Sequence, residues 1–410
     1  MSDVLSLSAF VEFTRAAGLA VLATASTTAK PEAALLAVAV TDSGELVVDI
    51  VGGARKLANI ERNEQVALVI GWDGDVSIQV EGRIRLVEGD ERRAREQTYL
   101  DRFPDSRVAD PAFAVAVITP DWIRRYDAST DPPRVDTLLD TGDARIAYTD
   151  EGHGQPVLLL HGSLSADWFA PVAKLLVERG YRVLRPHRAG YGHSTDRTRH
   201  LDVPAHAAHA AAVLTASGVT GARVVGHSSG AAVALELART RPDLVGSLVL
   251  LEAAFPYAPD EPKNPAMPRA VAAARAGDHE AAFDLFLGGV GGPDFRDVFV
   301  RELGLDGLRG AIDTAEYFFT AESPGFGRWS FGPAEQAGVT APVLLVVGGA
   351  GERLGTPHRA RSAQLAAGLP HATMRVLPGV GHLMPLEDPT LVAATIAEFV
   401  GDSDGRGRHA

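Results

Sequence analysis

A five-residue segment at positions 226–230, Gly-His-Ser-Ser-Gly, has the residue types and spacing of a serine nucleophile held in a sharp turn. An apolar strand is predicted before it over Ala222–Val225, and a helix after it over Ala231–Arg239. The glycines let strand and helix approach closely, and the positive end of the helix favours the negative charge that develops during acyl transfer. We therefore interpret Ser228 as a candidate nucleophile.

A second segment could supply hydrogen-bond donors for that negative charge. The apolar run Leu158–Leu160 predicts a buried strand, which ends in His161-Gly162-Ser163. A loop in this position provides one backbone N–H to a developing oxyanion, and the residue after the nucleophile, Ser229, provides another. These residues predict an oxyanion hole formed by Ser163 and Ser229.

A late histidine is the candidate general base. A strand is predicted over Met374–Leu377, and a glycine-rich loop leads from it to His382. The imidazole of His382 could take the proton of Ser228 and later deliver it to the leaving group.

The carboxylate that would orient this histidine has two candidates. Glu252 follows the predicted strand Leu248–Leu251, and Glu352 follows the predicted strand Val343–Val347. Both lie between Ser228 and the late histidine in chain order, as a triad acid of this kind should. The order of the residues leaves the choice between Glu252 and Glu352 open.

Two cations open a short predicted helix in the N-terminal part of the chain. Arg55 and Lys56 follow Gly52 and Gly53, at the end of the predicted strand Glu45–Val51. Flexible glycines, cations and a helix N-terminus together could bind a phosphate group.

The elements that must position these residues change in kind near residue 130. Before it, short strands separated by turns dominate, which favours a barrel or a sandwich. These predicted strands are Ala20–Thr24, Ala34–Val40, Glu45–Val51, Gln65–Ile70, Val76–Val87 and Phe113–Ile118. After a linker over 129–139, strands and helices alternate, which indicates a parallel sheet. A helical cap is predicted at about 255–337 and a loose tail at 401–410.

Composition excludes several classes of protein. The 410 residues include 39 Lys and Arg and 52 Asp and Glu, a net charge of −13, so a nucleic-acid partner is not expected. The chain has no cysteine, which rules out disulfides and thiolate chemistry. No metal site is predicted. The N-terminus lacks the pattern of a signal peptide and no run is long enough to span a membrane, so we expect a cytoplasmic protein.

Residues from about 140 to 400 resemble α/β-hydrolases of the Ser-His-acid type, through His161-Gly162, the turn at 226–230, the cap and His382. The resemblance implies a mostly parallel sheet and hydrolysis of a small-molecule ester, thioester, lactone or related acyl substrate. Similar hydrolases carry Glu at the end of the strand after the turn, which favours Glu252 slightly. Where many relatives have Asp, this chain has His187.

Residues 1–128 resemble the pyridoxamine 5′-phosphate oxidase-like, FMN-binding split barrels. The resembling segments, in order, are Gly18–Thr24, Arg55–Ile60, Gln79–Arg83 and Thr119–Tyr126. The resemblance implies a homodimer formed through the barrel and a flavin phosphate near Arg55 and Lys56, with Gln79 as a further contact. Members of this broad family also bind deazaflavin or haem.

Three functions are compatible with these patterns. The leading hypothesis is a serine hydrolase fused to a split barrel that binds FMN or only dimerises the chain. The second is a flavin- or deazaflavin-dependent oxidoreductase with an accessory hydrolase domain. The third is a ligand-binding protein without turnover, against which the pairing of Ser228 with His382 argues.

Overall fold

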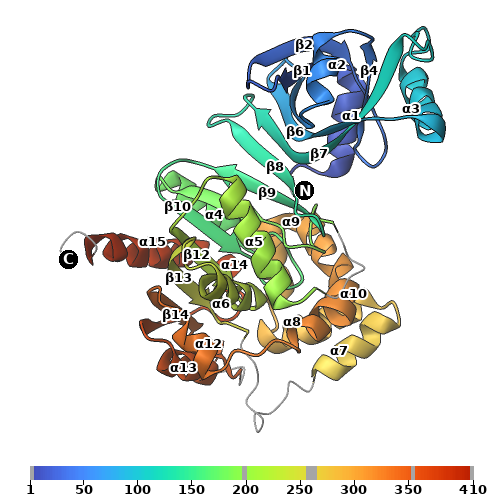
Figure 1. The fold of residues 1–410 in the computed structure, drawn as a ribbon. Coiled ribbons are helices and arrows are strands. Elements are labelled where there is room, and N and C mark those ends of the chain that lie inside the picture. The colour runs from blue at the N-terminus through green and yellow to red at the C-terminus, as the bar shows by residue number, and fades with distance from the viewer. Residues whose placement is uncertain (1–3, 196–200, 255–265, 352–355, 407–410) are drawn as a thin grey trace. The chain divides into compact units, whose positions relative to one another are not determined.

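The computed structural model describes residues 4–195, 201–254, 266–351 and 356–406. The chain divides into two compact units, and the boundary between them falls after Tyr148 (Figure 1). The smaller unit comprises residues 4–148 and is called here the barrel unit. The larger unit, from Thr149 onward, is called the hydrolase unit.

The barrel unit consists of antiparallel strands with three helices. Its elements are α1 (Leu7–Ala17), β1 (Leu19–Ala25), β2 (Pro31–Ala37), β3 (Ala39–Val40), β4 (Leu46–Val51), α2 (Arg55–Ile60), β5 (Gln65–Ile70), β6 (Val76–Leu86), α3 (Gly89–Arg102), β7 (Phe113–Asp127) and β8 (Arg134–Asp140). The strands pair in the order β8-β7-β6-β5-β1-β2, while β4 pairs with β3 and β7. Their inward side chains and α1 share one hydrophobic core.

The linker predicted over 129–139 is shorter in the structure. Residues 134–140 form β8, which pairs antiparallel with β7 from Arg134↔Asp127 to Leu139↔Trp122. The predicted strand Phe113–Ile118 correspondingly continues to Asp127 as β7. The prolines at 132 and 133 interrupt regular structure only at the turn between these strands, because the residues after them have backbone N–H groups that can again pair with β7.

The hydrolase unit alternates strands and helices. Its elements before the cap are β10 (Pro156–Leu160), α4 (Ala170–Glu178), β11 (Arg182–Pro186), α5 (Val203–Ala216), β12 (Ala222–His227), α6 (Ser229–Thr240) and β13 (Val245–Leu251). Those after it are β14 (Val343–Gly348), α13 (His358–Gly368), β15 (Ala372–Leu377), α14 (Met384–Glu387) and α15 (Pro389–Arg406). The strand β9 (Arg145–Glu151) spans the boundary between the units.

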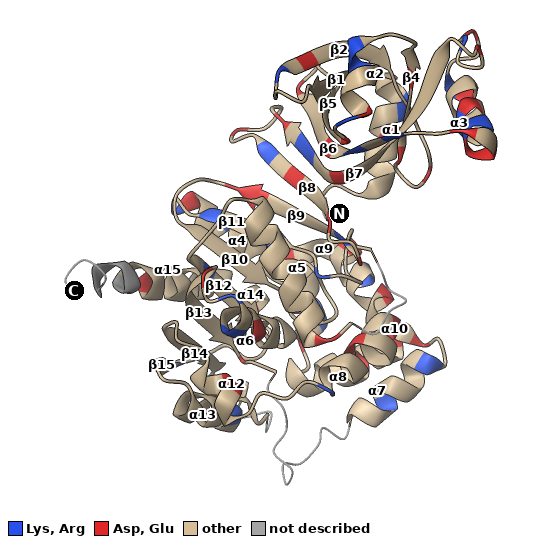
Figure 2. Ribbon diagram, in the orientation of Figure 1, with Lys and Arg blue, Asp and Glu red and all other residues tan. Residues whose placement is uncertain are grey.

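The sheet of the hydrolase unit is parallel, with the order β15-β14-β13-β12-β10-β11. β10, β13 and β14 contain no charged residue, as their tan colour in Figure 2 shows. Such continuously apolar strands are typical of parallel sheets covered on both faces. α4 and α15 share a core with these strands, while α6 packs on β12 and β13 and α5 packs on α6.

The cap lies between β13 and β14. Its helices are α7 (Ala266–Arg275), α8 (His279–Val290), α9 (Phe295–Asp313), α10 (Ala315–Tyr317), the π-helical turn η1 (Phe318–Glu322), α11 (Ser323–Phe326) and α12 (Pro333–Ala337). Its aromatic core, with Phe283, Phe299 and Phe319, also includes Leu164, Trp168 and Leu383 from loops of the sheet. The cap and these loops therefore share one core.

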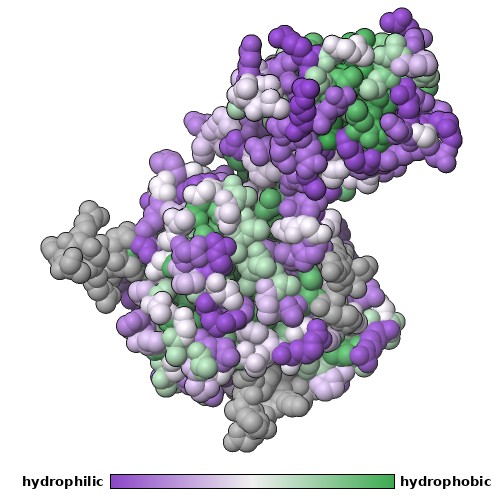
Figure 3. Space-filling model, in the orientation of Figure 1, coloured by the Kyte–Doolittle hydropathy of each residue, from purple (hydrophilic) through white to green (hydrophobic). Residues whose placement is uncertain are grey.

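The C-terminal end differs from the predicted loose tail. α15 continues through Arg406, so residues 401–406 are helical, and residues 407–410 of the predicted tail lie outside the described residues. None of the described helices is both long and apolar enough to cross a membrane. Hydrophobic residues do reach the surface of the barrel unit, where Figure 3 shows a patch of them among hydrophilic neighbours.

Candidate active site

Ser228 occupies a strained turn between β12 and α6. Its backbone has φ 52° and ψ −117°, a conformation that residues other than glycine rarely adopt. Two backbone hydrogen bonds hold the turn: the N–H of Ser228 donates to the carbonyl of Leu251 at 3.0 Å, and the N–H of Ala254 donates to the carbonyl of Ser228 at 2.9 Å. Strain kept in place by its surroundings is common at functional sites.

The glycines on either side of this turn are required by space. A Cβ atom on Gly226 would lie 2.5 Å from the Cα of Ala231, and one on Gly230 would lie 2.1 Å from the carbonyl oxygen of Leu160. Both contacts are with backbone atoms, which could move away only at a large cost in free energy. The sequence interpretation of these glycines, close approach of strand and helix, therefore matches the geometry.

Glu252 lies beside His382, 130 residues away in the chain. The Nδ1 atom of His382 is 2.8 Å from Oε2 of Glu252, and the N–H of Gly348 donates to Oε1 at 2.8 Å. Glu252 follows β13 directly and itself has a positive φ of 42°. The other candidate acid, Glu352, lies outside the described residues.

Two histidines that the sequence analysis did not single out support His382. His358, at the start of α13, stacks on His382 with ring centroids 4.6 Å apart and an interplanar angle of 7°. His227, the residue before the nucleophile, has its Nε2 2.8 Å from the carbonyl oxygen of His382. A histidine in the variable position of the turn is the only sequence signal for these contacts.

Polar atoms of Glu252, His358 and His382 lie within 4.8 Å of one another, a spacing that could surround a cation. The two imidazole rings are stacked, however, so their nitrogen lone pairs lie in two nearly parallel planes and do not converge on one point. The cluster therefore suits packing of neutral rings around a carboxylate better than metal coordination.

Burial shifts the pKa of each of these groups. It lowers the pKa of His382 to about 4 and the pKa of His358 to about 3. Burial also raises the pKa of Glu252. His358 and the hydrogen bond from the N–H of Gly348 lower this pKa and so partly offset the effect of burial. Because the pKa of His382 lies well below neutrality, its imidazole is neutral at pH 7, the form that can accept a proton.

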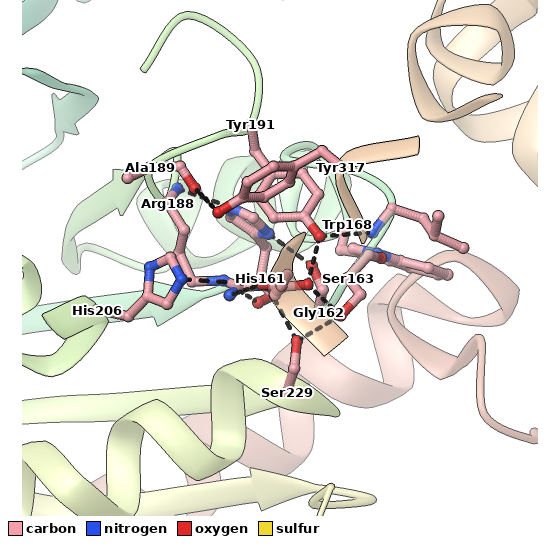
Figure 4. Close-up of polar contacts among 12 residues, drawn as sticks. His161, Gly162, Ser163, Trp168, Arg188, Ala189, Tyr191, His206, Ser229 and Tyr317 are labelled. Carbon is pink, nitrogen blue, oxygen red and sulfur yellow. Dashed lines mark hydrogen bonds and ion pairs between the residues drawn. The ribbon is translucent and has the colours of Figure 1, made fainter. Parts of the chain in front are cut away.

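Ser163 and Ser229, the predicted oxyanion residues, lie together. Their hydroxyl oxygens are 2.9 Å apart, and the indole N–H of Trp168 donates to the carbonyl of Ser163 at 2.7 Å (Figure 4). A Cβ atom on Gly162 would lie 3.3 Å from the Cβ of Ser228, which places this loop against the candidate nucleophile. The structure thus brings together Ser163, Ser229 and Ser228.

His187 takes over a local structural role where many relatives have aspartate. Its Nδ1 accepts a hydrogen bond from the backbone N–H of His193 at 3.1 Å, and its carbonyl accepts one from the hydroxyl of Ser194 at 2.6 Å. The imidazole therefore holds the turn after β11 in place of a carboxylate.

The candidate phosphate residues of the barrel unit lie in two places. Arg55 and Lys56 begin α2, where the side chain of Arg55 is 82% exposed and 3.8 Å from Glu32. Gln79 lies on β6, and its Oε1 accepts a hydrogen bond from Arg124 at 3.4 Å. Among the described residues, no hydrogen bond or ion pair joins Gln79 to Arg55 or Lys56.

Each of the two units matches a known protein family. The model of the alpha/beta hydrolase family matches residues 157–395, more than half of the chain, so the protein belongs to the alpha/beta hydrolase family. The model of pyridoxamine 5′-phosphate oxidase matches residues 7–127. The predicted two-domain architecture, an oxidase-like barrel followed by an α/β-hydrolase, is therefore confirmed.

Individual relatives match the hydrolase unit. The chain is 38% identical over 122 residues to a non-heme haloperoxidase of Rhodococcus erythropolis, covering 29% of this chain and 44% of that protein. It is 35% identical over 133 residues to a non-heme chloroperoxidase of Streptomyces lividans, covering 32% and 48%. The chain thus spans about half the length of these curated relatives.

A solved structure has the same fold. A thermophilic esterase from Thermogutta terrifontis superposes with a TM-score of 0.56 at 23% identity, covering 66% of this chain and 98% of that one. At this identity the likeness establishes the fold of the hydrolase unit.

Proposed function

We propose that the hydrolase unit is a serine hydrolase that cleaves a carboxylic ester, thioester, lactone or related acyl substrate. The observation that carries the proposal is the 2.8 Å contact between His382 Nδ1 and Glu252 Oε2, together with the strained turn at Ser228. The name of the similar esterase from Thermogutta terrifontis fits ester hydrolysis, while the relative from Rhodococcus erythropolis is named a haloperoxidase.

In the proposed reaction, the hydroxyl oxygen of Ser228 attacks the substrate carbonyl carbon and its proton moves to Nε2 of His382. Glu252 accepts the Nδ1–H and stabilises the imidazolium that forms. The N–H groups of Ser163 and Ser229 donate to the oxyanion. Collapse of this intermediate releases the alcohol, which takes the proton from His382, and water then hydrolyses the acyl-enzyme by the same steps.

A fluorophosphonate probe tests the proposal directly, because it reacts with activated serines. Mass spectrometry should find the adduct on Ser228, and p-nitrophenyl esters of increasing acyl length should define the acyl preference. An intact protein that neither forms this adduct nor turns over any ester would support the third hypothesis, a ligand-binding protein without turnover.

The dependence of kcat/KM on pH should follow the ionisation of His382. Its pKa of about 4 lies below the ordinary histidine value, so the active neutral form persists into mildly acidic solution. We expect activity to be lost only as pH falls through this low pKa and to be flat from weakly acidic to neutral pH. An acidic limb at the ordinary histidine pKa would contradict the burial argument.

We also propose a flavin phosphate site at the start of α2, which the first hypothesis allows and the second, an oxidoreductase, requires. The exposed guanidinium of Arg55 and the neighbouring Lys56 fit a phosphate, and Gln79 is the further expected contact. Bound FMN would supply the redox chemistry itself. Asn59 holds this helix in place, since its amide donates to Thr24 at 3.0 Å.

Absorbance after addition of FMN and desalting should show a retained flavin band. Replacing Arg55 and Lys56 together by alanine should weaken FMN binding by about tenfold or more, because hydrogen bonds to charged groups are lost. Arg93→Ala, on α3, is the control for loss of an exposed arginine. Equal affinity of the double variant and the wild type for FMN would contradict the proposed site. If the wild type does not bind FMN, the same comparison is made with deazaflavin and haem.

A homodimer through the barrel unit is proposed from one sheet face. Val21 on β1 pairs with Leu35 on β2 and Val69 on β5, so the three side chains lie in a row on the outward face. Leu35 is 59% exposed and Val69 38%. The outer face of an antiparallel sheet is normally polar, so an apolar row favours burial against a second copy.

Sedimentation velocity should give twice the 43.2 kDa of one chain for the wild type. The double variant Leu35→Glu/Val69→Lys should sediment as a monomer, because charges would be buried in the interface. Leu305→Glu, equally exposed but in the cap, should remain dimeric. A wild-type monomer, or a dimeric double variant, would contradict this interface.

A further inference from the structure

A buried ion pair lies directly behind the predicted oxyanion residues. The side chains of Arg188 and Glu322 are only 3% and 1% exposed, and Nη1 of Arg188 donates to Oε1 of Glu322. Taking two charges out of water is costly, and apolar residues of similar size would often be at least as stable. The proposed acyl chemistry uses neither charge, so the pair requires another explanation.

The pair contacts both oxyanion residues. Nη2 of Arg188 donates to the hydroxyl of Ser229 at 3.0 Å (Figure 4). The hydroxyl of Ser163 donates to Oε2 of Glu322 at 2.9 Å. With the 2.9 Å contact between the two hydroxyls, these bonds form a closed ring of four side chains. Tyr191 adds a hydrogen bond from its hydroxyl to Glu322.

Arg188 also fixes the backbone of the same loop. Its Nε donates to the carbonyl of His161 at 3.1 Å, and its own backbone N–H donates to Nε2 of His161 at 2.8 Å. The loop after β10 is thereby tied to the loop after β11. Removing a member of such a network leaves the remaining buried groups without their partners.

Glu322 comes from the cap, whereas Ser163 and Arg188 lie in loops that follow sheet strands and Ser229 begins α6. Glu322 ends η1, a π-helical turn, which is a rare local structure found often at functional sites. The cap therefore inserts one carboxylate into the network that fixes Ser163 and Ser229. A displacement of η1 would leave Arg188 as an uncompensated buried charge beside the oxyanion residues.

We propose that Arg188 and Glu322 are positioning residues that hold the oxyanion N–H groups of Ser163 and Ser229 in their reactive geometry, and that catalysis consequently depends on a docked cap. This inference rests on the proposed hydrolase function. Oxyanion stabilisation requires donors placed close to where the charge develops, so a small shift of these loops is costly.

The test uses the full chain and p-nitrophenyl acetate. Glu322→Gln keeps the size of the side chain but removes its charge, and should lower kcat by about 10- to 100-fold with KM nearly unchanged. Glu236→Gln is the matched control, since Glu236 is also buried and paired with an arginine, Arg239 at 2.6 Å, but lies outside the network. Its kcat should stay near that of the wild type.

The double variant Arg188→Met/Glu322→Leu separates positioning from stability. Its melting temperature should equal or exceed that of the wild type, because neither charge of this pair remains buried, yet kcat should remain at least about tenfold reduced. A double variant that melts and turns over like the wild type would overturn the proposal.

Hydrogen exchange gives a readout that does not depend on turnover. The peptide covering residues 160–170 should exchange about tenfold faster in Glu322→Gln than in the wild type or in Glu236→Gln. An unchanged exchange rate in Glu322→Gln would overturn the positioning role, even if the double variant Arg188→Met/Glu322→Leu failed to fold. A wild type inactive on all esters would instead refute the proposed function, while the exchange comparison still decides the inference.

Discussion

Ser228→Ala is expected to reduce ester hydrolysis by about 10⁴- to 10⁶-fold, the loss typical for removal of a serine nucleophile. The reason is that the other hydroxyl of the turn, on Ser229, is held by Ser163 and Arg188 and has no histidine beside it in the structure as described to take its proton. The residual rate should be that of a site that only binds and polarises the substrate. Stopped-flow assays with reactive esters, together with loss of fluorophosphonate labelling, measure the effect.

Ser247→Ala is the control for this experiment, because Ser247 is a buried serine on β13 of the same unit. It should keep both activity and labelling. If Ser228→Ala retained wild-type turnover with every reactive ester, the assignment of the nucleophile would be wrong.

Glu252→Gln should lower kcat by about 10³- to 10⁴-fold while the protein stays folded. Glutamine has nearly the same shape, but its amide cannot both accept the Nδ1–H of His382 and stabilise the imidazolium. The histidine would then favour the wrong tautomer, and the protonated form would lose its counter-charge. Steady-state kinetics, with the melting temperature measured in parallel, checks the result.

Glu352→Gln is the matched variant, since Glu352 was the other acid that chain order allowed. Its activity should remain near that of the wild type. The reverse pattern, with a large loss in Glu352→Gln and little in Glu252→Gln, would show that Glu352 orients the histidine and that the contact of Glu252 is structural.

Local patterns in the sequence were sufficient for the parts of the site that follow one another along the chain. A strand, a Gly-x-Ser-x-Gly turn and a helix determine the conformation of Ser228 within a few residues, and the alternation of apolar runs determines the parallel sheet. The barrel unit was recognisable from the order of several weak segments. Its extra strand β8 was missed, because its pairing with β7 depends on a turn that looked like a linker.

Contacts between segments that are distant in the chain could not be predicted from local sequence patterns. The choice of Glu252 depends on how β13 and the loop after β15 meet, across 130 residues. Arg188 and Glu322 are 134 residues apart, and neither lies in a motif that indicates a partner. The same holds for His358, whose stacking on His382 follows from the position of α13 against the sheet.

The shared core of cap and loops has a consequence for how this protein can diversify. Leu164, Trp168 and Leu383 pack among the aromatic residues of the cap, and Trp168 also holds the loop at Ser163. The cap is therefore not an exchangeable module: grafting another cap would remove packing that supports the loops at Ser163 and Leu383.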